Sequence, residues 1–182
     1  MNKKRWICGI LLALLISAST LSVFGADVEI SGSAKFTNQV SRALTLLKEK
    51  APKAYSITTN FVGRIEQGKK SGMWAYKKPP TYEIADRTTF YSVTWCAGSI
   101  AHDSFHSKLY HEYKNNHSGR VPNKIWTGVE AEKKCLKHQL EVLKKIKAPK
   151  HEIAYFSKLH GDHHDTNKDG KYDETDYKER DW

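Results

Sequence analysis

The sequence has no internal repeat and no low-complexity linker, and it contains only three cysteines in 182 residues. The absence of repeats excludes an array of structural modules, and the absence of a linker leaves no boundary between two domains. Acidic residues are also in the minority, with 20 against 30 basic residues and a net charge of +10. The length allows one domain with a real core and leaves little room for a second one.

Hydrophobic residues make up 39% of the chain and charged residues 27%. This composition excludes a chain that is disordered throughout and a membrane protein with many spans. The basic residues are dispersed and no recognised nucleic-acid-binding motif accompanies them, so we expect no nucleic-acid partner.

Residues 1–25 have the layout of a secretory signal peptide. Three basic residues near the start precede a mostly apolar run over residues 7–21, and Val23 and Gly25 provide small residues before Ala26. The alternative is an uncleaved anchor helix, because the apolar run approaches the ~20 residues that a membrane span needs. Polar residues late in the run favour cleavage. We therefore expect a secreted or periplasmic protein without a stable membrane span after cleavage.

Removal of this segment would take Cys8 with it and leave Cys96 and Cys135. An even number of cysteines in an oxidising compartment favours a disulfide between them. Two buried free thiols are the alternative.

The pattern of apolar residues predicts a fold of the α+β class in one domain. The predicted helices cover residues 35–50, about 92–113, about 127–147 and about 152–159. The predicted strands cover residues 55–67, 73–76 and 81–86, and the last should be a sheet edge because Pro79 and Pro80 precede it. A polar loop at 114–123 and a hydrophilic tail complete the chain.

The run HDSFH places His102 and His106 four residues apart on the second predicted helix. At this spacing two imidazoles project from the same side of a helix and can share one metal ion. Zinc peptidases use the same geometry in the motif HExxH, where the glutamate activates a water on the metal. Asp103 occupies the position of that glutamate. Two surface histidines without a metal are the alternative interpretation.

The third ligand should come from the third predicted helix, which offers Glu130 and Glu132. Glu132 falls within the apolar stripe of that helix, whereas Glu130 falls among its exposed lysines. An unpaired buried carboxylate is costly, and a zinc ion held by two histidines would satisfy it. We therefore predict that Glu132 is the third zinc ligand.

Over about residues 81–143 the sequence resembles the zincin-like metallopeptidases, and within them the gluzincins, whose third ligand is a glutamate from a downstream helix. The resemblance implies a small sheet, packed on a central metal-binding helix, whose edge strand at 81–86 pairs with a peptide or protein substrate. It also implies that Asp103 is the general base. Aspartate is one methylene shorter than glutamate, so general-base catalysis here requires that its carboxylate reaches the water directly or through a second water.

The C-terminal segment carries the spacing of a calcium-binding loop in the run DTNKDGKYDETD. Its oxygen ligands would be Asp165, Asn167, Asp169, the Lys171 carbonyl, Asp173 and Asp176. Aspartate at the last position resembles the loops of dockerin modules more than those of calcium sensors. A single loop suggests a structural calcium ion, and a solvated acidic turn is the alternative.

These observations divide the chain into a signal peptide at 1–25, a zincin-like domain at 26–160 and a calcium-binding segment of the same domain at 161–182. The predicted function is a secreted, monomeric, zinc-dependent hydrolase, in particular a metallopeptidase that uses metal-activated water. The alternative is a non-catalytic exported protein that uses the same scaffold to bind a partner or a cell-surface polymer. The substrate is not predictable from the sequence.

Overall fold

The computed structural model describes residues 28–163, 165–169 and 174–179. The predicted signal peptide at 1–25 lies outside the described residues, and so do Lys171 and Asp173 of the predicted calcium loop. Among the described helices, none has both the length and the apolar character that a membrane span requires.

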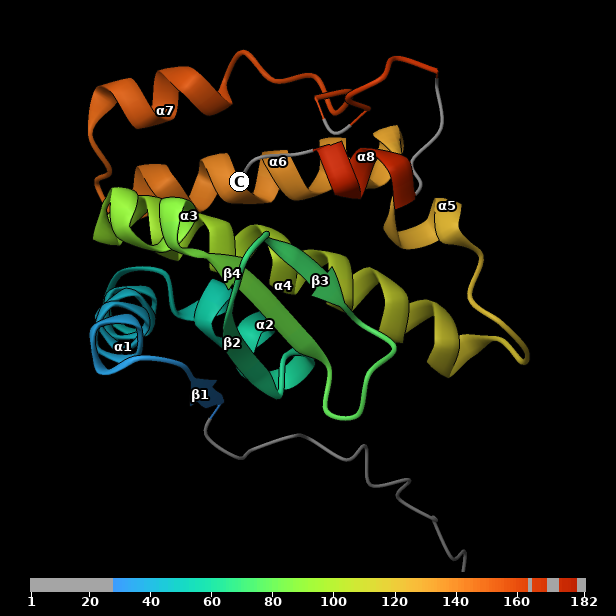
Figure 1. The fold of residues 1–182 in the computed structure, drawn as a ribbon, viewed down its shortest axis with the longest axis horizontal. Helices are drawn as coiled ribbons and strands as arrows, with labels where there is room; N and C mark the ends of the chain where they lie inside the picture. The colour runs from blue at the N-terminus through green and yellow to red at the C-terminus, as the bar shows by residue number, and fades with distance from the viewer. Residues whose placement is uncertain (1–27, 164, 170–173, 180–182) are drawn as a thin grey trace, which may run out of the picture.

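The fold is mixed α+β, as predicted, with a small sheet and a larger helical part (Figure 1). The elements in chain order are β1 (Glu29–Ser31), α1 (Ala34–Lys50), α2 (Pro52–Phe61), β2 (Arg64–Gly68), β3 (Gly72–Trp74), β4 (Thr81–Ala85), α3 (Asp86–Tyr91), α4 (Val93–Asn116), α5 (Asn123–Trp126), α6 (Val129–Lys145), α7 (Lys150–Phe156) and α8 (Glu174–Glu179).

The predicted strand at 55–67 is wrong, because α2 occupies most of this range and β2 begins only at Arg64. Pro52 stands in the first turn of α2, where a missing backbone N–H costs nothing. Ala54 and Thr58 lie one turn apart and are buried, and the Thr58 hydroxyl donates to the Ala54 carbonyl. The β-branched residues of this range therefore fit a helix whose buried face is narrow.

The sheet has the strand order β1-β2-β4-β3. The strands β1, β2 and β4 are parallel, and β3 pairs antiparallel with β4. The prediction that residues 81–86 form a sheet edge is therefore wrong, since β4 is hydrogen-bonded on both sides. Pro79 and Pro80 precede the first residue of β4, where they interrupt no ladder hydrogen bond, so they do not force the strand to the edge.

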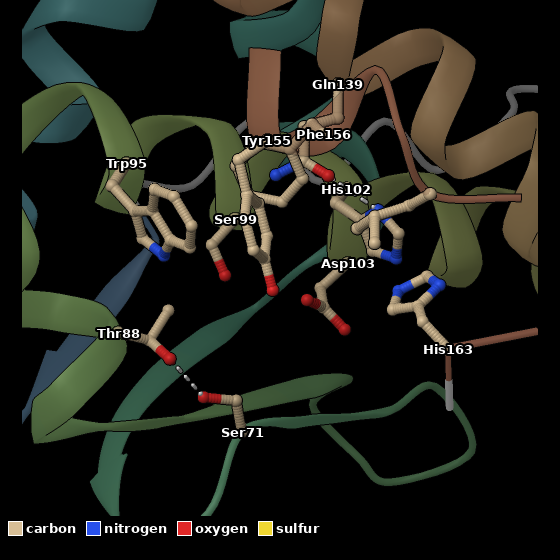
Figure 2. A pocket seen from close by; sticks show the side chains of 11 residues that line it. Ser71, Thr88, Trp95, Ser99, His102, Asp103, Gln139, Tyr155, Phe156 and His163 are labelled. Atoms are coloured by element: carbon tan, nitrogen blue, oxygen red, sulfur yellow. Dashed lines mark hydrogen bonds between the residues drawn. The ribbon is translucent and has the colours of Figure 1, made fainter. Parts of the chain in front are cut away.

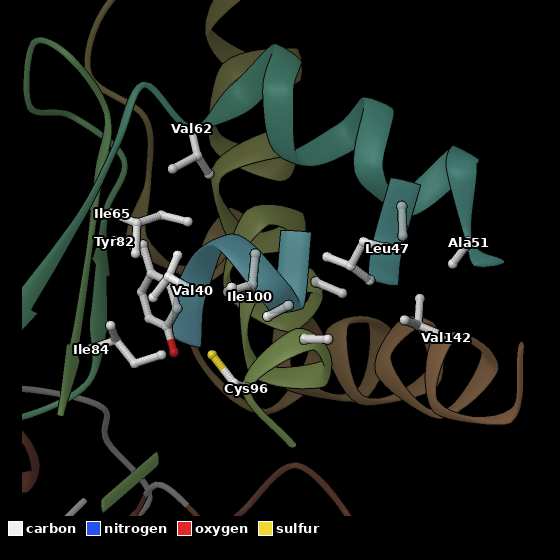
Figure 3. Close-up of a cluster of buried hydrophobic side chains, with 14 of the residues drawn as sticks. Val40, Leu47, Ala51, Val62, Ile65, Tyr82, Ile84, Cys96, Ile100 and Val142 are labelled. Carbon is white, nitrogen blue, oxygen red and sulfur yellow. The ribbon is translucent and has the colours of Figure 1, made fainter. Parts of the chain in front are cut away.

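The long helix α4 forms the centre of the molecule, with α6 and α7 on one side and the sheet, α1 and α2 on the other (Figure 1). Most of its residues from Cys96 to Ser107 are buried, because neighbours surround it. The core combines one face of α1 with the sheet and α4, and it includes Phe36, Val40, Leu47, Ile65, Tyr82, Ile84, Cys96 and Ile100 (Figure 3).

Two contacts fix α4 against its neighbours. Its start is held by Glu152 of α7, which is 1% exposed and accepts hydrogen bonds from the hydroxyls of Ser92 (2.7 Å) and Thr94 (2.8 Å). A carboxylate is favourable there because the N-terminus of a helix is electropositive. One turn further along, Gly98 allows close approach of α6, since a Cβ built at Gly98 would lie 2.8 Å from Cδ2 of Leu143.

Candidate metal centre

The two histidines of the HDSFH run project from the same side of α4, as their spacing predicts. Their Nε2 atoms lie 3.0 Å apart, and both side chains are buried. The structure therefore brings two strong zinc-binding nitrogen atoms to one point in the interior.

Glu132 of α6 completes this arrangement from the other side. Its Oε2 lies 3.1 Å from Nε2 of His102, and its Oε1 lies 3.2 Å from Nε2 of His106. The carboxylate is buried, whereas Glu130 is exposed and bonds to Lys133. Glu132 is thus the glutamate that faces the histidines, and it lies on the buried face of α6, as its position in the apolar stripe predicts.

The other nitrogen atom of each imidazole is held by an acceptor oxygen. Nδ1 of His102 lies 3.0 Å from Oε1 of Gln139, and Nδ1 of His106 lies 2.6 Å from the backbone carbonyl of Trp126. An acceptor oxygen requires a hydrogen on Nδ1, so Nε2 is the nitrogen atom of each imidazole that could lose its hydrogen and bind a metal. Metal-binding histidines are commonly oriented by such outer partners.

Neither outer partner was predicted from the sequence. Gln139 lies seven residues after Glu132 and is 2% exposed, so a buried polar residue on the same stripe of α6 was the available signal. Trp126 contributes only its backbone, at the end of the short helix α5, and its side-chain type gives no sign of this contact.

Cys135 is a further donor at this point. The ligand atoms of His102, His106 and Cys135 all lie within 4.8 Å of one another. Cys135 lies one turn after Glu132 on α6 and is 0% exposed. Sequence reasoning assigned this residue to a disulfide and missed its position beside the histidines.

The predicted bridge between Cys96 and Cys135 is not formed, and both thiols are free and buried. Cys96 points into the apolar core, in the region of Val40, Tyr82 and Ile84 (Figure 3). Cys135 points at the histidines instead. The two cysteines therefore face different neighbours, although they come from adjacent helices.

Burial and charge shift the pKa values of three groups at this centre. Burial raises the pKa of the Cys135 thiol, and His106 lowers it only in part. Burial alone would lower the pKa of His106, but Cys135 and Glu132 reverse this effect and hold its pKa well above the usual value. Burial also raises the pKa of Asp103, against the opposing effect of the two histidines. The three shifts share two causes, which are the burial of the groups and the electrostatic interactions between them.

Asp103 lies next to the histidines and interacts with the Tyr82 hydroxyl, which is hydrogen-bonded to the Ser99 hydroxyl. Tyr82 comes from β4, so the sheet fixes the carboxylate that follows the first histidine. The sequence did not indicate this contact, because it joins residues that are far apart in the chain.

Asp103 and His102 line a cavity of about 90 Å³ (Figure 2). Its lining includes the hydroxyl residues Ser71, Thr88 and Ser99 and the largely apolar residues Trp95, Tyr155, Phe156 and Leu159. His163 also lines the cavity and is only partly exposed. The volume is several times the ~10–15 Å³ that one water molecule needs, so part of a small molecule fits.

Four of the six predicted calcium ligands lie in the described part of the chain. The backbone N–H of Asp169 donates to the side chains of Asp165 (3.1 Å) and Asn167 (3.0 Å). Asp176 is buried and accepts from the backbone and hydroxyl of Thr166. The two ends of the predicted loop are therefore close together, and calcium binding there remains a prediction.

Comparison with known proteins identified no relative of this chain. No protein-family model, no curated protein and no solved structure matches the chain.

Proposed function

We propose that this chain is a zinc-dependent hydrolase of the zincin-like type, most specifically a peptidase, in which His102, His106 and Glu132 bind the metal. The observation that carries the proposal is the convergence of both Nε2 atoms and both Glu132 oxygens, at 3.0–3.2 Å, while both Nδ1 atoms are occupied by acceptors. Three ligands of this kind suit a catalytic zinc ion.

A zinc ion bound there would supply Lewis-acid chemistry and lower the pKa of water in the site. Asp103 would then accept the proton of the attacking water and pass it to the leaving amine. The Tyr82 hydroxyl supports this role because it holds the carboxylate in one orientation at the wall of the cavity. Trp95 and Tyr155 would exclude water from the apolar side of the cavity.

A peptide substrate would enter beside β3 rather than at residues 81–86, since β4 has a neighbour on each side. The strand β3 is one of the two outer strands of the described sheet and is antiparallel to β4. Ser71 immediately precedes β3 and lines the cavity with Asp103. An extended peptide that adds to β3 is therefore directed toward the candidate metal centre. We further propose that the protein acts outside the cytoplasm, on the basis of the layout of residues 1–25.

Metal analysis is the first test. We expect one zinc per chain in protein that has been stripped of metal and reloaded, and loss of that zinc in a His102→Ala, His106→Ala double variant. His117→Ala is the matched control, because His117 lies at the end of the same helix and stacks on Tyr113, away from the centre. Stoichiometric zinc in the double variant would exclude this metal site.

Substitution of Asp103 tests the reaction. Asp103→Asn keeps the size of the side chain but removes the basic carboxylate, so hydrolysis of a general peptide substrate should fall by roughly 10²–10⁴-fold. Asp103→Glu should maintain or raise hydrolysis, since it lengthens the reach. Zinc content should stay the same in both variants. Activity that survives Asp103→Asn would contradict the role of this residue.

The second candidate function is a non-catalytic metal-binding scaffold, favoured by the short aspartate side chain of Asp103, which stands where the zincin motif has a glutamate. In that case the wild-type protein and Asp103→Asn would be equally inactive while zinc binding is retained.

A further inference from the structure

His102, His106, Glu132 and Cys135 form a cluster of potential metal ligands, called the donor cluster below. Cys135 is the one of these four that has no role in the proposed hydrolysis. It follows Glu132 by three residues on α6, so both side chains project from the same face of that helix. Its thiol and the His106 imidazole shift each other's pKa, and its sulfur lies within 4.8 Å of the ligand atoms of both histidines. The thiol is fully buried, in contact with groups that bind zinc.

The spacing of these donor atoms suits a single ion. Zinc bonds of about 2.0–2.3 Å in a tetrahedron separate neighbouring donor atoms by about 3.3–3.8 Å. The Nε2 atoms and the Glu132 oxygens already lie 3.0–3.2 Å apart. The Cys135 sulfur lies within 4.8 Å of the ligand atoms of both histidines, which is near the separation that a shared tetrahedral ion requires.

We propose that Cys135 is a fourth ligand of the same metal ion and that its thiolate closes the resting site. This inference rests on the proposed function of His102, His106 and Glu132. Four protein ligands are typical of closed zinc sites, whereas catalysis requires a position for water or substrate. Hydrolysis then requires that the sulfur is displaced or that the coordination expands toward the cavity.

The position of Cys135 relative to the cavity agrees with such a resting state. His102, Asp103 and Gln139 line the cavity, but Cys135 does not (Figure 2). The thiolate would therefore bind the metal on the side away from the cavity. A substrate would approach from the cavity, on the side of Asp103. Metal binding deprotonates a coordinating thiol outright, so the high pKa of the free Cys135 thiol is no obstacle.

The cobalt-substituted protein tests the ligand assignment, with Cys96 as the matched control. Cys96 is equally buried on the adjacent helix but lies outside the donor cluster. We expect a sulfur-to-cobalt charge-transfer band in the near ultraviolet for the wild-type protein and for Cys96→Ala. Cys135→Ala should bind cobalt without this band, and so should Cys135→Ser if alanine impairs folding.

Zinc affinity gives a second measurement. Cys135→Ala should weaken zinc binding by more than the roughly 10–100-fold that loss of an outer partner costs, while Cys96→Ala should leave it unchanged. With zinc at saturation, Cys135→Ala should hydrolyse a peptide faster than the wild-type protein, because a coordination position is open.

The results separate this inference from the proposed function. Cobalt bound stoichiometrically without a charge-transfer band would overturn the fourth ligand and leave the three-ligand site intact. A band that persists in Cys135→Ala would also overturn it. Failure of the wild-type protein to bind cobalt or zinc would overturn both. Slower hydrolysis by zinc-saturated Cys135→Ala would overturn the closure of the resting site.

Discussion

Gln139 of α6 holds His102 of α4 through a hydrogen bond of 3.0 Å from Nδ1 to the amide oxygen. Gln139 is 2% exposed, so the contact is buried between the two helices. The bond fixes the proton on Nδ1 and directs Nε2 at Glu132, and it therefore prepares the imidazole for a metal before any metal binds.

Removal of this acceptor should weaken metal binding. We expect Gln139→Leu to lower zinc affinity by roughly 10–100-fold, because the imidazole loses its fixed orientation. Gln139→Glu keeps an acceptor oxygen at the same place and should retain most of the affinity. Competition with a chromophoric chelator measures both variants. Equal affinity of Gln139→Leu and the wild-type protein would show that the hydrogen bond does not orient the ligand.

The contact between α4 and α6 should be sensitive to one added methyl group. A Cβ at Gly98 would lie 2.8 Å from Cδ2 of the fully buried Leu143. We expect Gly98→Ala to destabilise the fold by about 1–3 kcal/mol in chemical denaturation, since overpacking outweighs the better helix propensity of alanine.

A double variant isolates the cause of that loss. Leu143→Ala removes the atoms that the new methyl group meets, so Gly98→Ala should cost less in the Leu143→Ala background than in the wild-type background. Strictly additive losses in the two variants would mean that the close approach at Gly98 is not the source of the effect.

His138 should make the fold less stable in acid. Burial lowers its pKa from 6.5 to about 4, and its Nε2 has no hydrogen-bond partner among the described residues. The unfolded chain therefore binds a proton that the folded chain does not bind between these two pH values. Stability from this residue is fully present above pH 6.5 and is lost as the pH falls toward 4, by roughly 2 kcal/mol after allowance for partial exposure.

Thermal or urea unfolding at pH 7 and pH 4.5, with a chelator present, measures this effect. His138→Leu removes the titrating group and keeps an apolar contact with Phe105, so its stability should fall less between the two pH values. An identical fall in the variant and the wild-type protein would assign the acid sensitivity to other groups.

Calcium should stabilise the C-terminal segment if the predicted loop binds it. A ligand that binds only the folded state adds about 2.7 kcal/mol at a hundredfold excess over Kd. Calcium should therefore raise the melting temperature of the wild-type protein, and Asp169→Ala should abolish the rise. Asp162→Ala is the control, since Asp162 is exposed and lies just before the loop. A full calcium response in Asp169→Ala would exclude this loop.

The sequence predicted the elements in which one face is clearly apolar. The helices α1, α4 and α6 were predicted within a few residues, and the stripe of α6 selected Glu132 over Glu130. The prediction of a strand at 55–67 failed because α2 contains β-branched residues, which are typical of strands, and begins at a proline. The interior position of β4 depends on pairing with β2 and β3, which no local pattern encodes.

The candidate centre was only half predictable for the same reason. A spacing of four residues identifies His102 and His106, but the contacts of Gln139, the Trp126 carbonyl and Tyr82 with the centre exist only after α4, α5, α6 and β4 pack together. Cys135 was misassigned because cysteine count predicts a bridge, while the direction of each side chain decides whether one forms.

The bonds from Ser92 and Thr94 to Glu152 mean that the start of α4 gains its acceptor only late in synthesis. The hydroxyls of Ser92 and Thr94 find this acceptor about 60 residues downstream, and the two histidines face Glu132, which is also made after them. A nascent chain that has emerged only as far as α4 therefore carries both histidines without the partners that position them. If the centre binds zinc as proposed, its ligands are complete only after α6 has been made, and the start of α4 gains its buried acceptor only when α7 follows.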